Sequence, residues 1–308
     1  MTAPTIISQD MNEAGYLLYL TSEGLDSTTA TNLVNHLIAI APADNMIPTE
    51  IVEQNAGAVT PVPDILTPEG DQPMVLALHS SGNTVDTSLF PHLHTIIQPY
   101  SGQGNNVLTI LGPNNEHIYL GDLGGVAGNN FDIILNDTGN DYVYGGDASG
   151  DTVICGAGAD HVILGTGVTP SGGTSGTHDY IQGGTGSNQV LNGLDPSTVF
   201  QDGTGANQSL IGKGGGDTFT IGNASSEIVR LGGSDNNTIN VAFNGANQAT
   251  IDGFTKTDII NFADTFADAT ITTANGHTTV SFASGQSVTI TGTHDAAHFA
   301  GDPSIHYI

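Results

Sequence analysis

The chain has 308 residues, which is enough for one long domain or two. It contains 31 Asp and Glu but only 3 Lys and Arg, so its formal net charge is −28, and its first basic residue is Lys213. A chain this acidic repels nucleic acid and anionic membrane surfaces, and we expect it to attract cations. Hydrophobic residues make up 37% of the chain and recur in a regular pattern, so we expect a folded protein rather than a disordered one.

Residues 1–100 are expected to form a small N-terminal segment that contains a helix. The apolar spacing after Ser27 predicts one amphipathic helix, ended by Pro42, whose buried face would consist of Ala30, Leu33, Val34, Leu37 and Ile38. Residues 59–73 contain four prolines and predict an extended linker. Residues 74–78 and 94–97 predict short strands that lead into the next region.

Residues 101–251 contain a broken nine-residue repeat. Its clearest copy runs from Cys155 to Ile163, and the shared frame is Gly-Gly-x-Gly-x-Asp/Asn-x-apolar-x. In each copy, three residues would form a short strand with its apolar middle residue inward, and six would form a turn in which glycine allows close approach of neighbouring turns. Two repeats would complete one coil. The repeat therefore predicts a parallel β-roll, or β-solenoid.

Residues 252–308 differ from the repeats and are expected to cap them. Residues 269–282 predict a β-hairpin around an Asn275-Gly276 turn, and residues 287–291 predict a third strand. The expected fold is therefore all-β, with a small α-containing N-terminal segment (1–100), a parallel β-solenoid (101–251) and a C-terminal β-hairpin cap (252–308).

The repeat turns carry the candidate metal ligands. Asp carboxylates and Gly carbonyls of stacked turns would face each other, and such hard oxygens suit Ca²⁺. The candidate calcium ligands are Asp137, Gly139, Asp141, Gly146, Asp147, Asp151, Gly156, Gly158, Asp160, Asp179, Gly184, Gly186 and Asp217. The alternative is that these aspartates are ordinary turn residues.

Asparagine replaces aspartate at the ligand position of some copies. These positions are Asn106, Asn188, Asn207 and Asn237. An Asn side chain offers a carbonyl oxygen without a charge, so we expect weaker calcium binding there. Stacked Asn side chains can instead form a ladder of hydrogen bonds to one another.

The nonapeptides, followed by the closing motif Asp252-Gly253-Phe254 and the strands in residues 279–292, resemble the repeats-in-toxin (RTX) family of Gram-negative bacteria. Members of this family leave the cell through type I secretion machinery. The resemblance implies a calcium-binding protein found outside the cell or on its surface, with a secretion-signal region in residues 252–308. The sequence after Met1 lacks the features of a Sec-type signal peptide. We therefore expect the export signal to lie elsewhere in the chain.

The RTX family includes toxins, proteases, lipases, adhesins and surface-layer proteins, so the resemblance implies a scaffold rather than a reaction. The sequence contains no His-Glu-x-x-His, no Gly-x-Ser-x-Gly and no phosphate-binding loop, and we expect no enzymatic activity. No apolar run approaches the ~20 residues of a membrane helix, so no membrane insertion is expected. Cys155 stands at a small-residue position and is the single cysteine.

The outward strand positions favour contact with other surfaces. Several of them are apolar, namely Tyr142, Tyr144, Ile154, Ile163, Tyr180 and Leu191. Such a stripe is typical of a face that self-associates, or of one covered by the N-terminal segment or by the insertion at residues 165–176. The expected function is a secreted calcium-binding structural protein that self-assembles into a homo-oligomer or polymer, as a surface layer, filament or biofilm matrix. The alternative is a calcium-stabilised adhesin or module for cell-surface glycans, and a small secreted enzyme ranks last.

Overall fold

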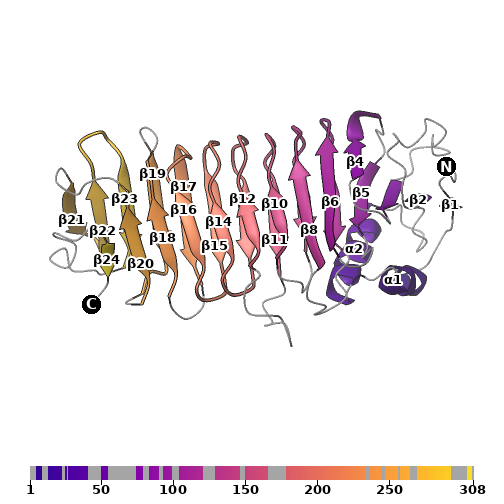
Figure 1. Ribbon diagram of the computed structural model, residues 1–308, viewed down its shortest axis with the longest axis horizontal. Coiled ribbons are helices and arrows are strands. Elements are labelled where there is room, and N and C mark those ends of the chain that lie inside the picture. The colour runs from indigo at the N-terminus through magenta and orange to yellow at the C-terminus, as the bar shows by residue number, and fades with distance from the viewer. Residues whose placement is uncertain are drawn as a thin grey trace. The chain divides into compact units, whose positions relative to one another are not determined.

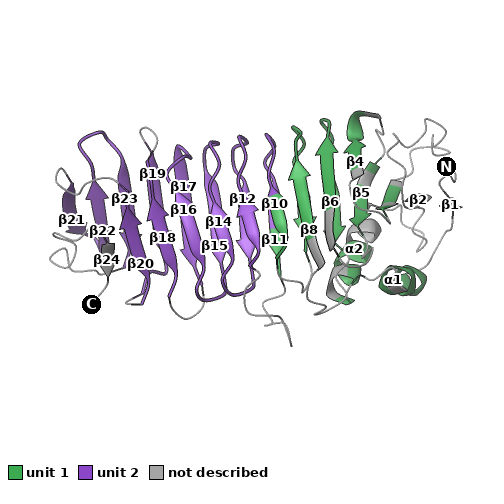
Figure 2. Cartoon of the chain, in the orientation of Figure 1, with its two compact units in different colours: residues 1–153, 163–166, 170–177 green, residues 154–162, 167–169, 178–308 purple. Residues whose placement is uncertain are grey.

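The structure of this protein is a computed structural model, and it describes most of the residues of the chain. These are residues 5–8, 13–22, 25, 27–40, 50–54, 74–78, 83–89, 93–98, 104–120, 129–145, 150–165, 178–232, 236–243, 247–255, 257–263, 269–292 and 304–306. The chain forms two compact units (Figure 2). Unit 1 comprises residues 1–153, 163–166 and 170–177, and unit 2 comprises residues 154–162, 167–169 and 178–308. The predicted linker at residues 59–73 lies outside the described residues.

Unit 1 combines two short helices with two sheets (Figure 1). The helices are α1 (Glu13–Ser22) and α2 (Ser27–Ile40), and a 3-10 turn, η1, covers Thr87–Leu89. The first sheet contains β1 (Thr5–Ser8), β2 (Glu50–Gln54), β3 (Met74–Leu78), β5 (Leu93–Gln98), β7 (His117–Leu120) and β9 (Tyr142–Tyr144). The second sheet contains β4 (Asn83–Asp86), β6 (Gly104–Leu111) and β8 (Asn129–Leu135). All these neighbours pair in parallel except β1 and β2, which are antiparallel.

The boundary between the units falls within two strands, β10 (Thr152–Ile154) and β11 (His161–Leu164). Unit 2 also has two sheets, and its first sheet contains β13 (Val190–Gly193), β15 (Gln208–Gly212), β17 (Ser226–Leu231), β19 (Gln248–Asp252), β23 (Ser287–Thr291), β22 (His277–Ser281) and β21 (Thr270–Ala274). Its second sheet contains β12 (Tyr180–Gln182), β14 (Val199–Gln201), β16 (Thr218–Ile221), β18 (Thr238–Val241), β20 (Ile259–Phe262) and β24 (Ser304–His306).

Successive strands of the regular region of unit 2 alternate between the two sheets, so two strands complete one coil and each strand pairs with the strand one coil later. This arrangement is a parallel β-solenoid, and the predicted all-β fold is confirmed. The coil is slightly longer than two nine-residue repeats, because Val190 pairs with Ser209 and Val199 pairs with Thr218, each 19 residues later. Unit 1 has longer coils, and there His117 pairs with Tyr142, 25 residues later.

The predicted inward residues form the core of the solenoid. The apolar residue two positions after each repeat aspartate is fully buried, as Val143, Val153, Val162, Ile181 and Phe219 show. The rings of Phe200 and Phe219 stack at a centroid distance of 4.7 Å, one coil apart. Stacked coils thus place like side chains on top of one another, which excludes water from a narrow interior.

One predicted register is wrong. The repeat frame predicts that Leu191 points outward, yet it is completely buried, and its neighbour Val190 is only partly buried. The same shift occurs in the next coil of this sheet, where Leu210 is the buried residue. The reason is the extra residue in each 19-residue coil: it falls in the turn before β13 and β15, and a shift of one residue turns a strand's side chains to the other face.

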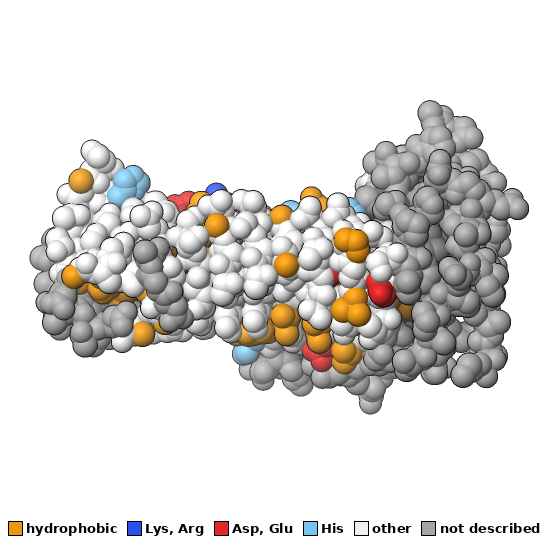
Figure 3. All heavy atoms as spheres, turned by 90° about the horizontal axis from the view of Figure 1, so that it is seen from above, with side chains coloured by type: hydrophobic (Ala, Val, Ile, Leu, Met, Phe, Trp, Pro, Cys, Tyr) orange, Lys and Arg blue, Asp and Glu red, His pale blue; other side chains and the backbone are white. Residues whose placement is uncertain are grey.

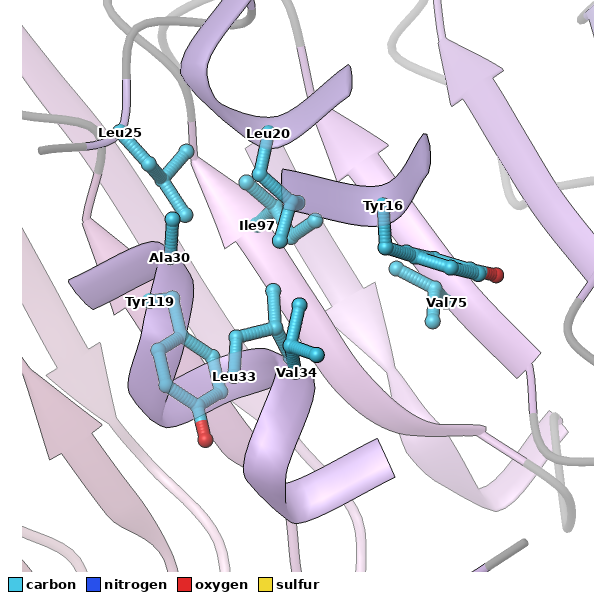
Figure 4. Close-up of a cluster of buried hydrophobic side chains, with 9 residues drawn as sticks. All are labelled: Tyr16, Leu20, Leu25, Ala30, Leu33, Val34, Val75, Ile97 and Tyr119. Atoms are coloured by element: carbon cyan, nitrogen blue, oxygen red, sulfur yellow. The ribbon is translucent and has the colours of Figure 1, made fainter. Parts of the chain in front are cut away.

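The N-terminal helices cover one region of unit 1 through an apolar cluster (Figure 4). Tyr16 and Leu20 of α1 and Leu33 of α2 meet residues of the first sheet, and the cluster consists of Tyr16, Leu20, Leu25, Ala30, Leu33, Val34, Val75, Ile97 and Tyr119. The helical face predicted after Ser27 is confirmed at Ala30, Leu33 and Val34. Tyr144, predicted in the apolar stripe, packs against this cluster, so its half-buried ring contributes to the interior of unit 1.

The C-terminal hairpin is also confirmed. β21 and β22 pair antiparallel around Asn275 and Gly276, which have φ of 53° and 77°, as a tight hairpin turn requires. The third strand, β23, pairs antiparallel with β22 and parallel with β19, so the hairpin extends the first sheet of unit 2. None of the described helices has the length and apolar character needed to cross a bilayer.

Candidate metal centre

Three buried carboxylates, those of Glu116, Asp137 and Asp141, meet in the turns of unit 1 at a place that we call the Glu116 corner. Glu116 comes directly before β7, and Asp137 and Asp141 lie in the turn between β8 and β9. One carboxylate oxygen from each of the three lies within 4.8 Å of the others. Glu116 and Asp141 are completely buried and Asp137 is 7% exposed. The repeat frame predicts Asp137 and Asp141 as ligands, and the fold adds Glu116 to them.

Stacking of adjacent coils brings this group together. The amide of Glu116 donates to Oδ1 of Asp141 at 2.9 Å, and the amide of Tyr142 donates to the carbonyl oxygen of Glu116 at 2.8 Å. Gly139, another predicted ligand, lies against the preceding turn so closely that a Cβ there would be 1.7 Å from the carbonyl oxygen of Asn114. Glycine is therefore required for the two turns to approach each other.

The electrostatics of this corner disfavour three negative charges without compensation. Within the described residues, neither carboxylate oxygen of Glu116 has a partner that meets the geometry of a hydrogen bond. Burial, and then the neighbouring Asp141 and Asp137, raise the pKa of Glu116 well above its usual range, and burial also raises the pKa of Asp141. No Lys or Arg precedes Lys213 in the chain, so no such side chain of unit 1 supplies a counter-charge.

The donor set of this corner fits a hard divalent cation. Three carboxylates offer up to six oxygens, and Ca²⁺ takes six to eight oxygen ligands, often from carboxylates and backbone carbonyls. The residues that would hold such an ion are Glu116, Asp137 and Asp141. Glu116 could have been anticipated from the sequence, because it occupies the aspartate position of a repeat copy that ends at Ile118 and Tyr119.

A different arrangement surrounds Asp160 in unit 2. Nε2 of Gln189 donates to Oδ2 of Asp160 at 3.0 Å, to the carbonyl oxygen of Gly158 at 3.0 Å and to that of Gly156 at 3.2 Å. Three predicted calcium ligands are thus brought together around one side-chain amide. On its other side, Oε1 of Gln189 accepts a hydrogen bond from the amide of Gly184, another predicted ligand, at 2.8 Å.

The amide contacts continue along the stacked coils. Nε2 of Gln208 donates to Oε1 of Gln189 at 3.2 Å, and the amide of Gly203 donates to Oε1 of Gln208 at 2.7 Å. Gln208 pairs in register with Glu227 of the next coil. The side-chain oxygens of Glu227 are buried and have no hydrogen-bond partner among the described residues. Burial, followed by the charge of Asp202, raises the pKa of Glu227 to about 9.

Asn188 takes a different place from the one predicted. The repeat frame puts it at the ligand position, but Gln189 occupies the buried corner, while Asn188 is exposed with a φ of 64°. Nδ2 of Asn207 donates to Oδ1 of Asn188 at 3.1 Å, so two of the four asparagines predicted to form a ladder bond to each other, on the outer surface. Oδ1 of Asn207 in turn accepts from the hydroxyl of Ser226 at 2.7 Å.

Two predicted aspartates beside the second sheet, Asp151 and Asp217, accept hydrogen bonds from backbone amides. Oδ1 of Asp151 accepts from the amide of Phe131, and Oδ1 of Asp217 accepts from the amide of Thr198, both at 2.9 Å. Burial raises the pKa of Asp217 to about 7, against the lowering effect of its backbone hydrogen bonds. Asp179 is also buried, and its main-chain carbonyl oxygen, rather than its carboxylate, accepts from the amide of Val199.

The remaining predicted ligands are glycines or lie outside the described residues. Gly184 and Gly186 stack on Gly156 and Gly158, where a Cβ would come within 1.9 Å and 1.8 Å of their carbonyl oxygens. The same contact recurs one coil later, where a Cβ at Gly205 would be 1.7 Å from the carbonyl oxygen of Gly186. Gly146 and Asp147 lie outside the described residues.

Comparison with known proteins adds no family to this picture. No family model matches the chain, and no curated protein matches it either. The function is therefore inferred from the fold and from the buried polar groups in its turns.

Proposed function

We propose that this protein is a secreted, calcium-binding structural protein of the RTX type that self-assembles outside the cell, as a surface layer, filament or biofilm matrix. We propose no enzymatic activity for it. The observation that carries it is the buried group Glu116, Asp137 and Asp141, whose oxygens converge in a region of the chain without Lys or Arg. Calcium would neutralise this group and so stabilise the stacking of the coils that contribute it.

Secretion and calcium binding support each other in this proposal. Extracellular calcium modules bind in the range of about 10⁻⁴–10⁻³ M, which matches calcium outside cells rather than inside. Without calcium, the Glu116 corner makes the folded chain less stable. A less stable chain is easier to export in an unfolded form. The resemblance of the repeats and of residues 252–308 to the RTX family points to the same location, outside a Gram-negative cell.

The calcium site is tested by a single substitution. Glu116→Gln removes one negative ligand while keeping the side-chain volume, so calcium affinity should fall by at least about tenfold, since affinity depends on the charge of the ligands. Isothermal titration calorimetry measures this change. Glu13→Gln is the matched control, because Glu13 is exposed on α1 and loses the same charge. Equal calcium binding by both variants and the wild type would exclude the Glu116 corner as the site.

Self-assembly finds support in an uncharged face of unit 2. The outward side chains of β12, β14, β16, β18 and β20 carry no charge, although the chain has 31 acidic residues. They are Tyr180, Gln182, Val199, Gln201, Thr218, Thr220, Thr238, Asn240, Ile259 and Asn261. Much of the described surface is likewise neither charged nor hydrophobic in the view of Figure 3. Two copies can approach through such a face with little repulsion.

Assembly is tested by light scattering and negative-stain electron microscopy in millimolar calcium. The variant Thr220→Asp places a charge in the middle of this face and should reduce the size of the assemblies, whereas Thr250→Asp, on the outward face of the first sheet, serves as its control. Monomers of the wild type at millimolar calcium would contradict the proposal.

The same face favours a second candidate function, an adhesin or glycan-binding module. Side-chain amides hydrogen-bond to sugar hydroxyls. The hydroxyl of Tyr180 lies 2.7 Å from Oε1 of Gln201 and 3.0 Å from Oε1 of Gln182, and its single O–H donates to this pair of oxygens, which holds the ring in place. Binding of neutral polysaccharides by wild-type protein, lost in Tyr180→Ala without loss of assembly, would select this function over the first.

A further inference from the structure

Gln189 lies where a cation would be expected in the repeat. Its Nε2 contacts two glycine carbonyls and one carboxylate, all three predicted from the sequence as calcium ligands, at 3.0–3.2 Å. A side-chain amide has two N–H donors, so it places partial positive charge among these oxygens. Because this amide belongs to the next coil, the chain itself supplies the positive charge, and no metal ion is needed.

The same position in the repeat has a different chemistry in unit 1. The residue directly before β7 is Glu116, the residue directly before β9 is Asp141, and these two strands pair in register. The residue directly before β13 is Gln189, which stacks on Asp160, the residue directly before β11. An acid stacked on an acid has no N–H between its oxygens, whereas an acid stacked on an amide does.

We infer that Gln189 decides whether its corner takes a cation: its amide occupies the cation position beside Gly156, Gly158 and Asp160, so this region of unit 2 is stable without calcium and the calcium requirement is confined to the Glu116 corner. This inference rests on the proposed calcium binding for its second half only. Gln208 has the same role in the next coil, where its Nε2 contacts Gln189 and the carbonyl oxygen of Gly184 at 3.2 Å and 3.4 Å.

Exchange of the amide for a carboxylate should create a new calcium site. In Gln189→Glu, the N–H donors disappear and a second carboxylate joins Asp160 and the two carbonyl oxygens. These four groups supply hard oxygens of the kind that Ca²⁺ takes, once each oxygen moves inward by about 0.6 Å from the N–H···O distance to the Ca–O distance. Equilibrium dialysis against calcium should therefore find one more bound ion per chain than in the wild type.

Gln248→Glu is the matched control for this experiment. Gln248 also lies in unit 2 and is exposed at the start of β19, so its exchange adds the same charge at a position open to solvent. It should leave the number of bound ions unchanged. The folding of both variants is checked by circular dichroism with calcium and with chelator, and Gln189→Glu should regain its wild-type spectrum only with calcium.

The outcomes separate this inference from the proposed function. If the wild type binds calcium through Glu116 but folded Gln189→Glu gains no ion, the inference is overturned and the function stands. If the wild type binds no calcium but Gln189→Glu gains one ion, the inference about the amide stands and the proposed calcium site fails.

Hydrogen exchange on the wild type gives a test that needs no variant. Removal of calcium by a chelator should speed hydrogen exchange at the backbone amides of Glu116 and Tyr142 by at least about tenfold, because these amides join the adjacent coils of the Glu116 corner. The amides of Gly184 and Thr185, which bond to Gln189 and Gly156, should change by less than about twofold. Equal loss of protection in both places would overturn the inference.

Discussion

At the scale of single residues, this solenoid stabilises buried acids in three ways. Backbone amides stabilise Asp202, whose Oδ2 accepts hydrogen bonds from the amides of Gly222, Asn223 and Ala224 at 2.6–3.0 Å. A side-chain amide stabilises Asp160, whose Oδ2 accepts a hydrogen bond from Nε2 of Gln189. Within the part of the chain that the structure describes, the carboxylate oxygens of Glu116 and Glu227 have no hydrogen-bond partner, so a cation or a proton has to balance their charge.

Glu227 predicts how stability depends on pH. Its folded-state pKa of about 9 lies above its ordinary value of 4.5, so the native protein holds a proton that the unfolded chain releases. The stabilising effect of that proton is fully present below about pH 4.5 and is lost as the pH rises toward 9. Each pKa unit corresponds to about 1.4 kcal/mol, so Glu227→Gln should stabilise the protein at pH 8 by at least about 1 kcal/mol.

Urea unfolding of wild type and Glu227→Gln between about pH 5 and pH 9 measures this effect. The variant should lose less stability than the wild type across this range, and Glu13→Gln should follow the wild type because Glu13 is exposed. A Glu227→Gln protein that is less stable than the wild type at about pH 8 would show that Glu227 acts there as a charged group.

At the scale of the elements, the turns determine how closely the coils stack. Gly184, Gly203 and Gly205 each approach the carbonyl oxygen of a glycine in the preceding coil to a distance that excludes a side chain. Strand pairing alone sets the spacing of neighbouring coils at about 4.8 Å. The glycine turns allow that spacing to continue around the corners, where the polar contacts form.

Gly186→Ala tests the glycine stacking. Its Cβ would be 1.8 Å from the carbonyl oxygen of Gly158, so the two turns must separate, and we expect a loss of about 2–4 kcal/mol in the free energy of unfolding. Gly276→Ala is the comparison, because Gly276 has a positive φ of 77° but no atom within 4 Å of the added Cβ. The free energy of unfolding of Gly276→Ala should fall by only about 1 kcal/mol. Similar losses in the two variants by chemical denaturation would contradict the steric argument.

At the scale of the whole molecule, the net charge of −28 opposes folding and assembly alike. Salt screens this repulsion at surface positions and leaves buried groups less affected. Calcium should therefore act in two ways, as a screening ion for the surface and as a ligand of the Glu116 corner.

Thermal melting separates these two effects. Sodium chloride should raise the melting temperature gradually, and calcium chloride at equal ionic strength should raise it further by several degrees, because ligand binding stabilises the native state by mass action. In Glu116→Gln the additional rise should disappear while the effect of sodium chloride remains. Equal effects of the two salts on the wild type would leave screening as the only action of calcium.

The architecture of this protein can be predicted from its sequence. The spacing of glycine, aspartate and apolar residues predicts a parallel solenoid with Val143, Val162 and Phe219 inside, and all three are buried. The helix that contains Leu33 and the hairpin at Asn275 and Gly276 follow from the same kind of pattern. These features depend on contacts between residues close in sequence or on a strict period, so the sequence displays them directly.

The residues that share a corner, in contrast, are set by the packing of distant coils. Glu116 and Asp141 are 25 residues apart and meet because two coils of unequal turn length stack in register. One extra residue in the turn before β13 places Gln189, rather than Asn188, beside Asp160, which lies 29 residues earlier in the chain. One residue in a turn reverses which side chain points inward, and only the pairing of distant strands fixes that choice.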